Sequence, residues 1–278
     1  MSDKAIDAAK SAAEVAGGAS LRTTPLFDKL STADRIRAAK EKTERVVDHL
    51  LYLLALHENN AIVLYSPTLS SQIPTSRAAN AFNVFQQGLH RIEIVRLCAL
   101  WDTPDLAKEN ISTIIELIDH PEVIATLAEE TSSHWRGMGA RVYPTTDDPD
   151  LQALAEEAIQ RSNEEFGEQQ AQKAREELRK AIADSRAILS SPKHASIMNL
   201  RDKHLPHSLS ETRRERRVGP LPPMKYGDER DVLNATLPIV EALYCWVNGT
   251  SFSLEDSREI DRRNAIALWT RCTFNVVE

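Results

Sequence analysis

Apolar residues recur at helical spacing along most of the chain, in long runs that proline and glycine interrupt. The run that begins near Ala33 places apolar residues three, four and seven positions apart, at Ile36, Val46, Val47, Leu50, Leu53, Leu54, Ala61 and Leu64. A half-buried strand requires alternation at every second residue, so this spacing favours helices. The best strand candidate, residues 61–65, is short and joins smoothly onto a helix. The sequence therefore predicts an all-α protein.

The composition agrees with this fold class and bounds the function. Only 9 of the 278 residues are glycine, and aromatic residues make up 5% of the chain, a balance that favours helices over strands. The net charge of −7 argues against capture of nucleic acid by overall charge but not against a local basic site. Cys98, Cys245 and Cys272 are widely spaced and form no disulfide framework or metal motif. With no apolar segment long enough to span a membrane and no signal-peptide centre, we expect a cytoplasmic protein.

The segments between proline, glycine and polar clusters give the expected order of elements. Residues 1–30 are small and polar and are expected to form a loose tail. Residues 131–149 and 208–227 are predicted to be loops, and Asp228 is expected to cap the helix that follows, with a kink at Pro238. Helices are predicted over about 33–65, 76–101, 105–118, 121–130, 150–189, 192–205, 229–247 and 254–274.

Two of these helices have unusual surfaces. Residues 76–101 are apolar on nearly all sides, which predicts a central, buried helix. Residues 150–189 combine one apolar face with many Glu, Gln, Arg and Lys residues, so this helix is either a solvated amphipathic helix or part of a coiled coil. We expect one helical domain over 31–278, into which the loop and long charged helix of 131–190 are inserted.

The segment Leu200–Ser208, LRDKHLPHS, contains the most informative group of polar residues. Arg201 and His204 are three residues apart and therefore share one face of the helix. Pro206 disfavours continuation of the helix, so His207 is expected just beyond its end. One guanidinium group and one or two imidazoles are thus expected together at a helix terminus.

These residue types suit the cleavage of a phosphodiester. Arginine offers a planar set of donors to phosphate oxygens and to the charge that develops in the transition state. Histidine titrates near neutral pH and can move protons. RNA carries its own nucleophile in the 2′-hydroxyl group, so the chemistry requires no metal. The alternative is that these residues simply form a solvated helix end.

The segment RDKHLPH resembles the motif of HEPN proteins, in which four to six residues lie between an arginine and the histidine that follows it. Here five residues intervene, and Asp202 fills the polar position after the arginine. The stretch from about 60 to 102, including YSPTLSSQIP, AANAF and EIVRLCALWD, resembles the abortive-infection, AbiU-type branch of that superfamily. The resemblance covers roughly 35–275, and Pro206 stands where the branch typically has alanine.

This resemblance implies an up-and-down helical bundle that forms a homodimer, with two Arg201–His207 pairs facing one shared cleft. It also implies metal-independent endoribonuclease activity that leaves a cyclic phosphate, in a toxin or an anti-phage defence protein. RNA, and an antitoxin or defence partner protein, are then the expected partners. Two alternatives remain: a catalytically silent HEPN-like module that binds RNA, a nucleotide or a protein, and a helical scaffold that uses 150–190 as its interaction surface.

Three residues of the helix 76–101 and its end are candidates for a supporting role. Glu93 and Arg96 are three residues apart on an otherwise apolar helix, and a buried charge is costly unless it is paired. They either form a structural salt bridge or, together with Asp102, orient Arg201 or His207 from a neighbouring helix.

A local basic run follows the motif. It consists of Arg213, Arg214, Arg216 and Arg217 and is either a phosphate-tracking surface for RNA or a solvated loop. We expect no cofactor. Asp202, His204 and His207 have a possible zinc spacing, but no further cluster completes a metal site. The chain contains neither a G-x-S-x-G elbow nor a glycine-rich phosphate loop.

Overall fold

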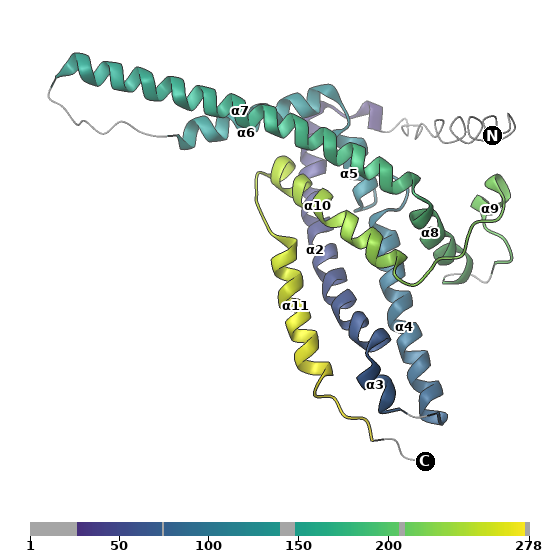
Figure 1. Ribbon diagram of the computed structural model, residues 1–278. Helices are drawn as coiled ribbons and strands as arrows, with labels where there is room; N and C mark the ends of the chain where they lie inside the picture. The colour runs from purple at the N-terminus through teal and green to yellow at the C-terminus, as the bar shows by residue number, and fades with distance from the viewer. Residues whose placement is uncertain (1–26, 74, 140–147, 206–208, 276–278) are drawn as a thin grey trace, which may run out of the picture.

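A computed structural model describes residues 27–73, 75–139, 148–205 and 209–275 (Figure 1). These residues form helices and connecting segments, without a strand, so the predicted all-α fold class is confirmed. The elements are η1 (Phe27–Lys29), α2 (Thr32–Tyr65), α3 (Pro67–Ser71), α4 (Arg77–Leu100), α5 (Ile111–Ile118), α6 (Pro121–Met138), α7 (Pro149–Ser190), α8 (Pro192–His204), α9 (Arg213–Val218), α10 (Asp228–Asn248) and α11 (Leu254–Trp269). Within the described residues, no helix combines the length and apolar character needed to cross a membrane.

The helix starts follow local capping chemistry. Four helices, α2, α4, α8 and α11, begin with a serine cap, in which the hydroxyl oxygen accepts a hydrogen bond from the backbone N–H three residues later. The capping residues are Ser31, Ser76, Ser191 and Ser253. Proline occupies the first position of α6, α7 and α8, where its missing N–H has no helical partner to lose. These signals explain why most predicted starts lie within one or two residues of the observed ones.

Helix α2 forms the centre of the bundle, with α4, α5, α10 and α11 packed around it. Leu50, Leu53 and Leu54 of this helix are fully buried. At the C-terminal end of α4, the indole Nε1 of Trp101 donates a hydrogen bond of 3.0 Å to Thr236 Oγ1 of α10. This contact fixes the point at which the chain leaves α4, next to the residues of the candidate site.

Helix α4 is not the fully buried helix predicted from its composition. One face packs on α2 and α8, but Phe85, Ile92 and Val95 are 46%, 47% and 42% exposed. The reason is its position at the edge of the bundle, where no further helix among the described residues covers it (Figure 1). The same face includes the exposed Ala81 and Ala99 and the half-buried Gly88, which gives a repeated spacing of four and three residues. We call these six residues, 81, 85, 88, 92, 95 and 99, the α4 seam.

Helices α6 and α7 form a hairpin that extends from the bundle (Figure 1). The prediction of a loop over 131–149 is wrong for residues 131–138, because α6 continues to Met138. The two helices approach closely at Gly167: a β-carbon there would lie 2.7 Å from Arg136 Cγ and 3.0 Å from the carbonyl oxygen of Ser132. A β-carbon at Gly139, just after α6, would meet the Asn163 side chain, so residues 149–162 of α7 extend beyond the end of α6, over a length of about 21 Å. The helix is therefore packed in its C-terminal part and exposed to solvent in its first turns.

Two other expectations at helix starts are also wrong. The helix expected to begin at 105 begins at Ile111, because the Asn110 side chain accepts a hydrogen bond of 2.8 Å from Thr113 N and caps it there. Asp228 does not cap α10. The N-cap residue of α10 is Gly227, which has a left-handed φ of 97°. The Asp228 carboxylate instead accepts a hydrogen bond from Lys225 N.

The tail expected over 1–30 is ordered at its end. Phe27 is buried, and its carbonyl accepts a hydrogen bond of 2.7 Å from the buried guanidinium of Arg35. Burial of the ring and this bond together fix residues 27–29 against the bundle. Residues 1–26 lie outside the described part of the chain.

Candidate active site

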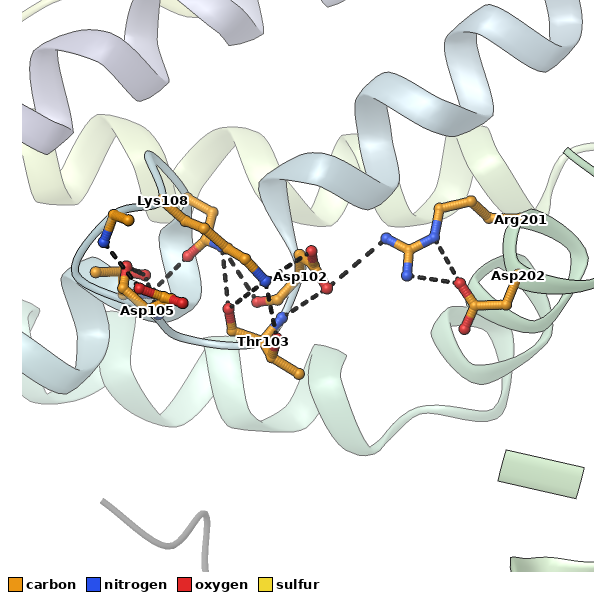
Figure 2. A network of polar contacts seen from close by, with 9 residues as sticks. Asp102, Thr103, Asp105, Lys108, Arg201 and Asp202 are labelled. Atoms are coloured by element: carbon orange, nitrogen blue, oxygen red, sulfur yellow. Dashed lines mark hydrogen bonds and ion pairs between the residues drawn. The ribbon is translucent and has the colours of Figure 1, made fainter. Parts of the chain in front are cut away.

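Arg201 lies in the last turn of α8, with its guanidinium between two carboxylates (Figure 2). Its Nε donates a hydrogen bond of 2.8 Å to Asp202 Oδ1, and its Nη2 lies 2.7 Å from the same oxygen. Its Nη1 lies 3.8 Å from Asp102 Oδ1, just beyond the end of α4. Arg201 is thus oriented from both sides while its side chain stays 20% exposed.

Asp102 is itself held by its neighbours. Its Oδ1 accepts a hydrogen bond of 2.9 Å from Thr103 N, and its Oδ2 accepts one of 3.0 Å from Lys108 Nζ. Lys108 Nζ also donates to Thr103 Oγ1 at 3.0 Å (Figure 2). The loop after α4 therefore presents a fixed carboxylate to Arg201, so the sequence-predicted residues Arg201, Asp202 and Asp102 come together.

The charges in this network stabilise one another. Partial burial alone would lower the pKa of Arg201, but its hydrogen bond to Asp202 and the nearby negative charges raise it above its usual value. Partial burial alone would raise the pKa of Asp102, but Lys108, the Thr103 backbone and Arg201 lower it below its usual value. Both groups are therefore charged at neutral pH. Beneath them, burial raises the pKa of the Cys98 thiol to about 12, which keeps it protonated.

Of the two histidines of the motif, His204 lies within the described part of the chain. His204 is exposed at the end of α8, on the face it shares with Arg201. Residues 206–208, and with them the predicted catalytic His207, lie outside the described residues. The residues that flank this segment are both bound to the last turns of α8: Leu205 N donates to Arg201 O, and Leu209 N donates to Lys203 O, each at 3.0 Å.

The basic run after the motif is attached to the motif helix through the one acidic residue inside it. Glu215 of α9 accepts hydrogen bonds of 3.1 Å from Asn199 Nδ2 and from Lys203 Nζ of α8. Thr212 forms a capping box with Glu215 and donates a hydrogen bond of 2.6 Å to Asn199 Oδ1. The Thr212 backbone, Asn199 and Lys203 together lower the pKa of Glu215 to about 2. The loop predicted over 208–227 therefore contains a short helix with a defined position.

This attachment turns the arginines of α9 outward. Arg213, Arg216 and Arg217 are exposed and Arg214 is half-buried. Arg216 Nε lies 3.8 Å from Glu211, and the other three form no ion pair within the described part of the chain. Three guanidinium groups without an ion pair among the described residues therefore lie on a helix that is attached to the motif helix, in an otherwise acidic protein.

Glu93 and Arg96 have different partners. They do not form the salt bridge with each other that was one of the two expectations from the sequence. Glu93 is buried, lies 2.6 Å from His57 Nδ1 and accepts a hydrogen bond of 2.6 Å from Asn60 Nδ2. Arg96 is exposed and lies over the ring of Tyr52, at 5.1 Å from the ring centre. Glu93 thus joins α4 to α2, and neither residue contacts Arg201 among the described atoms.

In the described part of the chain, no three His, Cys, Asp or Glu side chains are grouped closely enough to bind a metal ion. The possible ligands considered in the sequence, Asp202 and His204, lie at the end of α8, and Asp202 is engaged by Arg201. Their third partner, His207, lies outside the described residues.

Comparison with family models supplies the deciding observation. Residues 36–268 match the model of the AbiU2 family of HEPN domains. The chain belongs to this HEPN family. The match spans α2 to α11, including Asp102, Arg201 and the arginines of α9, so the resemblance seen in the sequence is confirmed. Searches of curated proteins and of solved structures found no match.

Sequence reasoning missed several residues that build this candidate site. Lys108 and Thr103 position Asp102, and Asn199 and Glu215 attach α9 to α8. A signal for one of them was present, because Thr212 and Glu215 have the spacing of a capping box inside the supposed loop. The role of Lys108 depends on the path of the loop after α4, and no local pattern in the sequence indicates that path.

Proposed function

We propose that this protein is a metal-independent endoribonuclease, in which Arg201 and His207 act on the RNA phosphodiester. The observation that carries the proposal is the guanidinium of Arg201, held between Asp102 and Asp202 near the end of the helix to which the arginine-rich α9 is attached. Membership of the HEPN family supports the same reading. Because a fixed, charged donor group costs little to reorganise, it suits the stabilisation of charge that develops on a phosphate.

In the proposed reaction, the 2′-oxygen of RNA attacks the adjacent phosphorus while the bond from phosphorus to the 5′-oxygen breaks. His207 accepts the proton of the 2′-hydroxyl group, and a protonated group, His207 of a second copy or His204, donates a proton to the leaving 5′-oxygen. Arg201 donates hydrogen bonds to the non-bridging oxygens as negative charge grows on them. The products are a 2′,3′-cyclic phosphate and a free 5′-hydroxyl group.

Asp202 and Asp102 have a positioning role in this proposal. A bidentate phosphate would compete with Asp202 for the guanidinium donors, so Arg201 must exchange one partner for another when substrate binds. Asp102, held by Lys108, keeps the arginine in place during that exchange. The arginines of α9 would bind neighbouring phosphates without regard to sequence.

The test is incubation of purified protein with mixed RNA in the presence of a chelator. Wild type is expected to cleave, whereas Arg201→Ala and His207→Ala should each lose cleavage and keep the helical circular dichroism spectrum. Arg179→Ala, an exposed change on α7, serves as the control and should cleave as wild type does. Persistent cleavage by both purified motif variants would overturn the assignment.

The second candidate is a catalytically silent HEPN module that binds RNA, a nucleotide or a protein with the same surface. The contact that favours it is the pairing of Arg201 with Asp202, which occupies donors needed for a phosphate. Binding of RNA without cleavage by the wild-type protein would support this candidate.

The proposal includes a homodimer and a role in defence. The α4 seam supports a dimer because its apolar residues repeat at coiled-coil spacing and are not covered by any other described part of the chain. A second copy packed on it would bring a second Asp102 and Arg201 towards the first. In this proposal the protein is a toxin or anti-phage protein controlled by an antitoxin or defence partner. Its overexpression should therefore arrest growth, and Arg201→Ala should relieve the arrest.

A further inference from the structure

A groove lies beside the motif helix, between α4, the end of α8 and the segment that precedes α10. Its volume is about 360 Å³, which is within the range of sites for small ligands. Its lining includes the aromatic rings of His90 and Tyr226, the cations Arg91 and Lys225 and the motif residue His204, above a floor that includes Ile94, Leu200, Leu205 and Met224. The groove therefore shares the residue His204 with the motif and adds an aromatic and basic surface beside it.

Tyr226 is exposed and yet held in position. Its ring stacks on His90, with 5.4 Å between ring centres and 21° between planes, and 76% of the residue remains exposed. Tyr65 meets the ring edge-on at 6.4 Å. The backbone on its C-terminal side is fixed by Gly227, whose left-handed φ closes the turn and whose N–H donates to the buried Glu229 at 3.0 Å. An exposed ring with a fixed orientation is a suitable platform for stacking.

The cations of the groove are free to bind an anion. The side chains of Arg91 and Lys225 are exposed and form no ion pair within the described residues. The nearby carboxylate of Glu229 is turned inward, because Tyr65 Oη and Gly227 N donate to it and His90 Nε2 lies 3.5 Å from it. The exposed surface of the groove therefore combines positive charge with an aromatic ring.

We propose that this groove binds an unpaired nucleotide of single-stranded RNA next to the cleaved phosphate, with its base stacked on Tyr226 and its phosphate on Arg91 and Lys225. His204 connects the two sites, because it lines the groove and lies three residues from Arg201 on the same helix face. Bases inside an RNA duplex cannot reach such a ring, so the groove selects single-stranded RNA. This inference rests on the proposed ribonuclease function and names its substrate class.

Binding to a short single-stranded RNA whose 2′-hydroxyl groups are methylated tests the groove separately from catalysis, because this RNA cannot be cleaved. Tyr226→Ala is expected to weaken binding by roughly 5- to 150-fold, as the loss of one stacked base does. Tyr226→Phe keeps the aromatic ring and should bind as wild type does. Phe252→Ala, an exposed aromatic in the connection from α10 to α11, is the matched control. Equal binding by Tyr226→Ala and wild type would overturn the proposal.

Charge and catalysis give two further readouts. Replacing Arg91 and Lys225 together by alanine should reduce the dependence of affinity on salt, whereas the double change Arg179→Ala and Lys180→Ala on α7 should not. With cleavable RNA, Tyr226→Ala should raise KM and leave kcat nearly unchanged. If wild type binds through Tyr226 but does not cleave, the ribonuclease function fails and the groove stands. Tighter binding of duplex than of single-stranded RNA would overturn the groove.

Discussion

At the scale of single residues, the surroundings of a group decide whether its charge is available. Arg201 and Asp102 remain charged because each is only partly buried and has a partner of opposite charge. His194, two turns earlier on α8, lies in the opposite kind of environment. Burial and the charge of Arg214 lower its pKa to about 4, and it packs against the buried Trp101.

This environment makes stability depend on the protonation of His194. Because the folded protein favours the neutral ring, the stabilisation is complete above pH 6.5 and is lost as the pH falls from 6.5 towards 4. We expect this residue to remove roughly 3 kcal/mol from the free energy of unfolding over that range. Urea unfolding at pH 7 and pH 4 measures the change. The variant His194→Leu should lose much less stability over the same range, and an unchanged pH dependence would contradict this account.

At the scale of elements, α9 depends on a single carboxylate. Removing Glu215 leaves Asn199 and Lys203 without their acceptor and breaks the capping box, so Glu215→Ala should release α9 from α8. Trypsin should then cleave rapidly after the arginines of 213–217. Glu211→Ala, which removes only an exposed contact with Arg216, is the control and should stay resistant.

The same attachment has a predictable response to acid. The pKa of Glu215 is about 2 in the folded protein and usually 4.5, so the attachment is complete above pH 4.5 and weakens as the pH falls towards 2. If trypsin cleaves α9 equally slowly in the wild type and in Glu215→Ala, other contacts hold α9 on α8.

The α6–α7 hairpin depends on the absence of a side chain at Gly167. Alanine usually stabilises a helix relative to glycine by about 0.5–1 kcal/mol, but here its methyl group would meet Arg136 and the Ser132 backbone. We expect Gly167→Ala to lower the melting temperature. Gly137→Ala on α6, where nothing lies within 4 Å of the new methyl group, should leave it unchanged or raise it. A stabilising effect at Gly167 would mean that the helices separate easily.

At the scale of the whole molecule, the α4 seam predicts the oligomeric state. If a second copy covers it, Ile92→Glu should convert a dimer into a monomer, as measured by light scattering after gel filtration. Leu154→Glu on the exposed first turns of α7 is the matched control and should remain dimeric. Dissociation by Leu154→Glu alone would assign the interaction surface to the hairpin instead.

The sequence predicts the helices well and their environments less well. Serine caps and prolines define the starts of α2, α4 and α8 locally, so they could be read directly. The exposure of Ile92 could not be predicted from the sequence, because apolar composition does not reveal whether the covering surface belongs to the same chain. Likewise, Asp102 could be named as a candidate from the sequence, but its support by Lys108 depends on how the loop after α4 folds back.

The first turns of α7 have a consequence for experiments on the intact protein. No helix of the described residues packs on residues 149–162, and their own side chains supply contacts such as Gln152 with Glu156 and Arg161 with Glu157. A helical segment this short is marginal in water without tertiary packing. Warming or added salt should therefore melt these turns first, and a small, gradual loss of helical ellipticity should precede the cooperative unfolding of the bundle.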